Sequence, residues 1–490
     1  MKQPIIQIKN WKTGISESPF EGTFANMVGV NVFKDKGLVQ VNEILRSSAY
    51  GNQNIWAFPY ILRSTFNTTY GDKFFAVGDL GISATIDYGA SWPNLTGFGT
   101  GIIIGAAIYK DYLVIMHPTN IDFYGPLSQE HLAGATWNNA RITTLPDSYL
   151  HPSFLSTRDD CIYIGAGRYV SRLQEKAGQV FNPTNTGTYT FTAKMMPSGL
   201  PAGATIQAIS ELPQARRLHL MTDKGIYPYV TTESLADNPI IPTERNVTAG
   251  VVANDKLYFF AGKKPSLYVT NGSSVQRLFR FPNYIFSQDD GIDYSIIDGS
   301  VIYNGSNILF GTKKGVGSWD VENNVFTFDA LSSRGEVTIY SHITPYGLCD
   351  IGDINNRYFF AFQDGTSYGI DIKTFNTYPT NVEAYGPYIE TGVIDFGNRF
   401  EGTGIGDIEL ILGKKMDATY PGTIKVSYRR NIADSWTTIK EFREASKDRL
   451  RCPFPLATAT NIQLRIDFKY RYYHTIKDYM PIKELNIYGR

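Results

Sequence analysis

The chain has 490 residues, and its 46 Lys and Arg balance its 46 Asp and Glu, so it carries no net charge at pH 7. Neutrality argues against a protein that works by neutralising phosphates or by coating an anionic membrane. The three cysteines, Cys161, Cys349 and Cys452, lie far apart and form neither a disulfide framework nor a zinc motif.

Two further classes are excluded by the apolar pattern. The first residues lack the uninterrupted apolar stretch of a signal peptide. The longest apolar run, residues 101–109, is far shorter than the roughly 20 residues that cross a bilayer. We therefore expect a soluble chain without a membrane span.

Residues 1–48 form an N-terminal segment, for which we predict two strands, at residues 24–32 and 38–41. The sequence leaves two roles open for this segment. It supplies the strand that closes the β-propeller predicted below, or it is an arm that docks on a neighbouring subunit.

Residues 49–384 contain a repeat of short apolar runs, each preceded by a polar residue. The spacing between these polar residues varies from 38 to 57 and averages about 47, which suits a four-stranded propeller blade. The runs lack alternation, as expected of strands that are buried on both faces. We therefore predict an all-β fold with a β-propeller of six or seven blades. The polar residues are Lys73, Asp111, Asp160, Arg217, Lys256, Asn307 and Arg357.

One local motif in this region, residues 85–92, resembles the Asp-box of sialidase-like propellers. Thr85 opens the motif, the Asp87 carboxylate accepts turn amide hydrogens, and Gly89 supplies a left-handed backbone. Trp92 then folds back over the hairpin. The motif predicts a structural β-hairpin and indicates no activity.

Residues 385–490 change in character and show longer alternating strands. A segment of about 100 residues with five to eight strands is the size of an independent β-sandwich, which we predict here. The strands are expected at residues 408–412, 423–428, 436–440, 461–468 and 482–488.

Motifs for catalysis are missing from the sequence. It contains no HExxH, GxSxG or Walker A pattern, and the six histidines are scattered. His219 sits inside an apolar run and is interpreted as a core or blade-edge residue. We expect no enzyme activity, no catalytic residues, no cofactor and no metal, and a sialidase-like glycoside hydrolase is the weakest alternative because its usual Arg-Ile-Pro tripeptide is absent.

The whole-chain architecture resembles the tail-nozzle proteins of short-tailed bacteriophages, also called phage stabilisation or tail accessory proteins. Residues 20–24, 27–33, 37–41 and 388–397 resemble segments of propeller-containing phage tail proteins. The resemblance implies a virion structural protein, assembled in the host bacterial cytoplasm, that forms a homo-oligomeric ring, with a hexamer expected. Such a ring would contact the portal, the adaptor and other tail proteins, extend the DNA-ejection channel and retain the genome until infection, with DNA passing through without sequence-specific binding.

An alternative from another functional class is a propeller that binds a receptor or glycan, as in a tail fibre or adhesin. A binding module should hold its ligand in a closed pocket of the propeller. A nozzle should bury several separate patches between copies.

Overall fold

The computed structural model of the 490-residue chain describes most of the sequence. The described residues are 4–11, 15, 24–28, 30–31, 40–41, 45–47, 60–64, 72–86, 91–99, 101–128, 132, 134–213, 217–230, 235–236, 239–262, 265–281, 296–313, 315–331, 339–345, 358–364, 367–373, 388–396, 403–413, 415, 423–444, 446–456, 458–469 and 482–489. Within these ranges the chain forms β-strands and short 3-10 turns but no α-helix, so the all-β prediction is confirmed.

The chain divides into two compact units. We call the unit made of Ser47–Lys313 and Val337–Ile372 the propeller unit. We call the unit made of Met1–Arg46, Lys314–Glu336 and Lys373–Arg490 the sandwich unit. The sandwich unit thus combines both ends of the chain with a short central segment.

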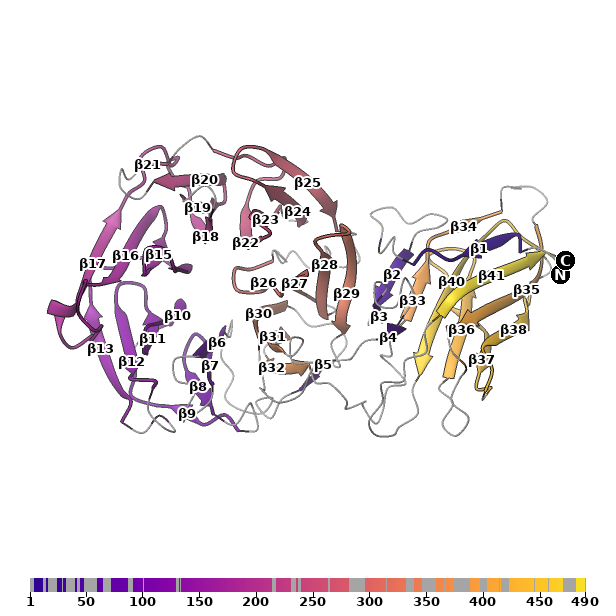
Figure 1. Cartoon of the computed structure of the whole chain (residues 1–490), viewed down its shortest axis with the longest axis horizontal. Coiled ribbons are helices and arrows are strands. Elements are labelled where there is room, and N and C mark those ends of the chain that lie inside the picture. The colour runs from indigo at the N-terminus through magenta and orange to yellow at the C-terminus, as the bar shows by residue number, and fades with distance from the viewer. Residues whose placement is uncertain are drawn as a thin grey trace. The chain divides into compact units, whose positions relative to one another are not determined.

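Seven antiparallel sheets, numbered here as blades 1 to 7, surround one axis in the propeller unit (Figure 1). Blade 1 is β6 (Tyr60–Ser64), β7 (Lys73–Val77), β8 (Ile82–Thr85) and β9 (Asn94–Leu95); blade 2 is β10 (Gly105–Tyr109), β11 (Tyr112–Met116), β12 (Ile121–Gly125) and β13 (Thr136–Ile142); blade 3 is β14 (Ser153–Ser156), β15 (Cys161–Ala166), β16 (Tyr169–Glu175) and β17 (Tyr189–Met195). Blade 4 is β18 (Ile206–Leu212), β19 (Arg217–Thr222), β20 (Gly225–Val230) and β21 (Leu235–Ala236); blade 5 is β22 (Val247–Ala253), β23 (Lys256–Ala261), β24 (Ser266–Thr270) and β25 (Val275–Arg280). Blade 6 contributes β26 (Val301–Tyr303) and β27 (Asn307–Thr312) to this unit, and blade 7 contains β30 (Ile339–Pro345), β31 (Tyr358–Asp364) and β32 (Ser367–Lys373).

The inner strand of every blade contacts the inner strand of the next. The order is β6, β10, β14, β18, β22, β26 and β30, and β30 contacts β6 in turn. The ring is therefore closed with seven blades, the larger of the two predicted numbers.

The second strand of each blade is the most deeply buried. β7, β15 and β27 are buried at almost every position because neighbouring blades cover both of their faces. The predicted apolar runs coincide with these second strands, which explains why they lack the alternation of a half-exposed strand.

Closure of the ring joins blade 7 to blade 1. Thr344 of β30 donates a hydrogen bond from its hydroxyl to the backbone oxygen of Ile61 in β6. The rings of Phe74 and Phe359 meet edge to face at 5.0 Å, and Trp92 packs on Phe359 at 5.6 Å. The short strand β5 (Leu45–Ser47), where the chain passes between its two units, lies beside β32 in the sheet of blade 7.

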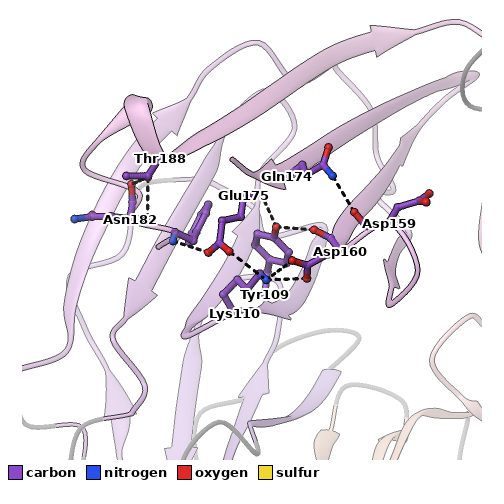
Figure 2. A network of polar contacts seen from close by, with 9 residues as sticks. Tyr109, Lys110, Asp159, Asp160, Gln174, Glu175, Asn182 and Thr188 are labelled. Carbon is purple, nitrogen blue, oxygen red and sulfur yellow. Dashed lines mark hydrogen bonds and ion pairs between the residues drawn. The ribbon is translucent and has the colours of Figure 1, made fainter. Parts of the chain in front are cut away.

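Polar contacts also join blade 2 to blade 3 (Figure 2). The Lys110 ammonium lies 2.6 and 2.7 Å from the two carboxylate oxygens of Asp160, and 3.5 Å from Glu175. The Tyr109 hydroxyl donates to the Asp160 backbone oxygen at 3.1 Å and accepts from the Glu175 backbone nitrogen at 2.8 Å. The first turn of blade 2 is thereby tied to two strands of blade 3.

The sandwich unit contains two main sheets. One sheet has the order β1 (Ile6–Ile8), β41 (Ile482–Gly489), β35 (Thr403–Leu412) and β38 (Arg449–Pro453). The other contains, in order, β28 (Gly315–Asp320), β29 (Val325–Leu331), β2 (Phe24–Val28), β33 (Tyr388–Thr391), β40 (Asn461–Lys469), β36 (Thr423–Arg429) and β37 (Thr437–Phe442). The predicted C-terminal sandwich strands are therefore present as β35, β36, β37, β40 and β41.

The N-terminal segment contributes to this sandwich. β1 pairs antiparallel with β41, and β2 lies between β29 and β33. The two strands predicted in the segment are found as β2 with β3 (Val30–Asn31) and as β4 (Gln40–Val41), and β3 pairs with β4.

Candidate ligand-binding cavity

A cavity of ≈ 780 Å³ lies within the propeller unit. Its lining comes from the inner strands of the blades, from Leu62 in β6 through Ala106 in β10 and Thr248 in β22 to His342 in β30. The cavity is therefore axial. Many of these inner strands carry Ala, Ser, Thr or Gly at the lining positions, and such short side chains leave the axis open.

Two carboxyl groups, Asp298 and Glu211, line the cavity. Lys and Arg are absent from its lining among the residues that the structure describes. The charged side chains of the lining are therefore acidic. The remaining polar groups, which include Gln207 and Asn246, are neutral hydrogen-bonding groups.

Glu211 is held by its neighbours at the end of β18. The Ser156 hydroxyl donates to one of its carboxylate oxygens at 2.9 Å, and Arg158 lies 2.9 Å from the other. Both donors belong to blade 3, so Glu211 joins blade 3 to blade 4. Because an arginine compensates its charge, Glu211 is a structural carboxylate at the edge of the cavity.

Asp298 lies in the tight turn that leads into β26. The Ser300 backbone nitrogen donates to the Ile297 backbone oxygen at 3.0 Å, which closes this turn. Burial raises the pKa of Asp298 to about 7, although a hydrogen bond from the backbone of Gly299 opposes the rise. Asp298 therefore exchanges a proton near neutral pH and can donate or accept a hydrogen bond there.

His342 lies directly over Gly299, the residue that follows Asp298. A Cβ atom at Gly299 would collide with the His342 ring, and the Gly299 backbone has a φ of +88°, so glycine is required for both reasons. The Ile343 nitrogen donates to the Gly299 oxygen at 3.0 Å and fixes β30 against this turn. Burial lowers the pKa of His342 to about 4, which keeps its imidazole neutral at pH 7.

His151 lines the same cavity but is engaged by backbone groups. Its Nδ1 lies 3.0 Å from the Gly165 oxygen and its Nε2 lies 3.3 Å from the Pro118 oxygen. Both ring nitrogens are thus occupied, so we assign His151 to the support of the loops and not to ligand contact.

The residues of the predicted Asp-box lie apart from this cavity. Thr85 is the last residue of β8 and is buried, and Trp92 is buried against Phe359. Neither residue lines the cavity. Asp87 and Gly89 lie outside the described residues, so the conformation expected for them stays a prediction.

Sequence reasoning missed the cavity residues. Asp298 and His342 are 44 positions apart and belong to different blades, so no local motif connects them. The buried location predicted for His219 is confirmed, since its side chain is 1% exposed in β19.

Two searches of the coordinates themselves gave negative results. In the described ranges, no group of three or more His, Cys, Asp and Glu side chains is placed to hold a metal ion. The same ranges contain no helix of the length and apolarity needed to cross a membrane.

Comparison with known proteins gives limited information. No family model and no curated protein matches the chain. Among solved structures, it is similar to the extracellular domain of BT4673 from B. thetaiotaomicron, described once as a one-component and once as a hybrid two-component system. Each match has 14% identity and a TM-score of 0.46, and each covers 78% of this chain. The chain spans 46% and 45% of those structures, and a likeness this weak supports no statement about function.

Proposed function

We propose that this protein is a ligand-binding β-propeller that recognises a polar receptor or glycan through its axial cavity. The observation that carries the proposal is the cavity itself, which combines a volume of ≈ 780 Å³ with hydrogen-bonding groups from several blades. A concave site with a few convergent polar groups is the usual form of a small-ligand site.

The charges of the cavity restrict the ligand class. Asp298 and Glu211 are acidic, while Lys and Arg are absent among the described lining residues. An anionic ligand would be repelled and would find no cationic partner. The cavity therefore favours a neutral or cationic polar ligand, such as a neutral glycan or an amino sugar.

Calorimetric titration with galactose, galactosamine and galacturonate tests this proposal, because the three sugars differ chiefly in charge. We expect galactosamine to bind best in the axial cavity, and Asp298→Asn to weaken its binding about tenfold by removing the charge attraction. The matched control is Glu322→Gln, which changes an exposed carboxylate outside the propeller unit. Failure of galactose and galactosamine to bind the folded protein would refute the proposal.

A second candidate function is the ring-forming virion protein implied by the family resemblance. Five exposed large apolar residues favour it: Leu80, Ile102, Tyr149, Met196 and Ile241. Leu80 lies between the second and third strands of blade 1, and each of the others lies between one blade and the next. In an up-and-down blade these two kinds of connection emerge at the same end. One face of the propeller therefore carries all five residues, and apolar groups concentrated on a face favour contact between subunits.

Native mass spectrometry tests this second candidate. A tail ring predicts a discrete oligomer, with a hexamer expected, and Tyr149→Asp should shift it towards the monomer. In that assembly DNA would run along the axis of the ring of copies, since the propeller's own cavity is acidic. A strictly monomeric protein at high concentration would remove the nozzle interpretation and leave the ligand-binding proposal untouched.

A further inference from the structure

A second pocket, of ≈ 730 Å³, lies between blades 4 and 5 and away from the axial cavity. Blade 4 supplies Arg217, His219 and Pro228, together with Ile240 and Ile241 from the connection that follows it. Blade 5 supplies the turn between β24 and β25, residues 271–274. The pocket shares no lining residue with the axial cavity.

His219 is the distinctive residue of this pocket. It lies two residues before Met221, and in blade 2 the residue two positions before Met116 is Val114. Val114 and Met116 both pack in the apolar core between blades 2 and 3, and Met221 packs in the corresponding core between blades 4 and 5. A polar ring therefore occupies a level of the strand where blade 2 has an aliphatic side chain.

The hydrogen bonds of His219 leave one nitrogen directed at the pocket. Nδ1 lies 3.2 Å from the Arg217 backbone oxygen, which only accepts, so Nδ1 carries the proton. Burial, with a smaller effect from the Arg217 charge, lowers the pKa of His219 to about 4, so the ring is neutral at pH 7. Nε2 is therefore a lone-pair acceptor, and it has no partner among the described residues although the side chain is almost fully buried.

The other walls indicate what the acceptor would meet. Pro228, Pro239, Ile240 and Val275 form aliphatic surface, while Ser273 and Ser274 add exposed hydroxyl groups. Asn271 accepts the backbone nitrogens of Ser273 and Ser274 at 3.1 and 3.3 Å and so fixes the turn that carries these hydroxyls. An amphipathic ligand with hydroxyl donors and a C–H face fits this combination.

The charge of the pocket is opposite to that of the axial cavity. Arg217 contributes a guanidinium group, and Asp and Glu are absent among the described lining residues. A ligand that combines hydroxyl donors with a carboxylate would use both the acceptor and the positive charge.

We propose that the groove between blades 4 and 5 is a binding site for an acidic saccharide unit, such as a uronic acid, which donates a hydroxyl hydrogen bond to Nε2 of His219 and places its carboxylate near Arg217. No covalent step is involved. The site is independent of the axial cavity, so either proposal can fail without the other.

Titration calorimetry with galacturonate, galactose and galactosamine tests the site on the full chain. We expect galacturonate to bind best at this pocket. His219→Phe, which removes the acceptor and fills the space, should weaken galacturonate binding at least tenfold, whereas His219→Gln, which retains a side-chain acceptor, should stay within about threefold of the wild type. Arg217→Gln should weaken galacturonate binding but leave galactose binding unchanged.

Two further variants separate this proposal from the axial one. Ser273→Trp changes an exposed residue at the pocket, and it should block galacturonate even if His219→Phe fails to fold. Asp298→Asn should leave galacturonate binding unchanged, because Asp298 lines only the axial cavity. Absence of galacturonate binding to the wild type, or unchanged binding in both Ser273→Trp and a folded His219→Phe, would overturn the proposal.

Discussion

The contact between blades 2 and 3 and the contact between blades 4 and 5 have the same topology but different fillings. In the first, the connection between β16 and β17 of blade 3 inserts Phe181, whose ring lies 5.1 Å from Tyr109 and 5.4 Å from Tyr189. In the second, the equivalent connection of blade 5 is the short turn at residues 271–274, and a pocket lies where the aromatic ring would be. The propeller thus uses one interface for cohesion and leaves another available for binding.

Removal of the aromatic plug should have the largest effect on this comparison. Phe181→Ala should lower the free energy of unfolding by about 3–5 kcal/mol, because a 3% exposed ring is lost and a cavity remains. Urea denaturation followed by tryptophan fluorescence measures the change. The neighbouring Val180→Ala, at a residue that is 84% exposed, is the control and should change stability by less than about 0.5 kcal/mol. A loss below about 1 kcal/mol for Phe181→Ala would show that the interface does not depend on the plug.

Acid should weaken the interface between blades 4 and 5 through His219. Its pKa is about 4 in the folded protein and near 6.5 in the unfolded chain, so the unfolded state binds the extra proton between these values. The stability is complete above about pH 6.5 and falls as the pH is lowered towards 4. The difference in unfolding free energy between wild type and His219→Gln should therefore change by roughly 3 kcal/mol from pH 7 to pH 4. His342, which titrates similarly, is present in both proteins and cancels; parallel pH profiles would contradict the assignment.

The hydroxyl of Tyr109 allows a finer test of the interface between blades 2 and 3. Tyr109→Phe leaves the Asp160 oxygen and the Glu175 nitrogen without the hydroxyl that pairs with both, so we expect a loss of about 2 kcal/mol. Thermal or urea unfolding measures it. An unchanged midpoint would mean that water replaces the hydroxyl at no cost.

The ion pair in the same network should contribute least. Lys110→Met breaks the contact with Asp160, but the Asp160 side chain is 64% exposed, so solvent screens the attraction. We expect a loss below about 1 kcal/mol that shrinks further in 0.5 M NaCl, measured by unfolding at two salt concentrations. A loss equal to that of Tyr109→Phe would place the strength of the interface in the charges and not in the buried hydroxyl.

Much of the fold could be predicted because each element leaves its own local pattern. The polar-then-apolar runs at Lys73, Lys256 and Asn307 coincide with the starts of β7, β23 and β27. The longer alternating strands of the sandwich were likewise predicted from residues 408 to 488. Seven blades in place of six, and the pairing of β1 with β41, required the coordinates, since neither leaves a local signal.

The binding sites could not be predicted in the same way. His342 meets Gly299 because the closed ring brings blade 7 against blade 6, and His219 faces a pocket because the turn of another blade is short. Only the side chains of neighbouring blades decide whether such a space is filled.

By itself, the sequence determined that this chain is all-β, that its middle is a propeller and that its C-terminal part contributes a sandwich, because strand burial imposes a periodicity on consecutive residues. The tertiary structure alone decided which spaces between and inside the blades stay open. The physical reason is that a cavity depends on the sizes and charges of side chains that are distant in the chain and adjacent only in the closed ring.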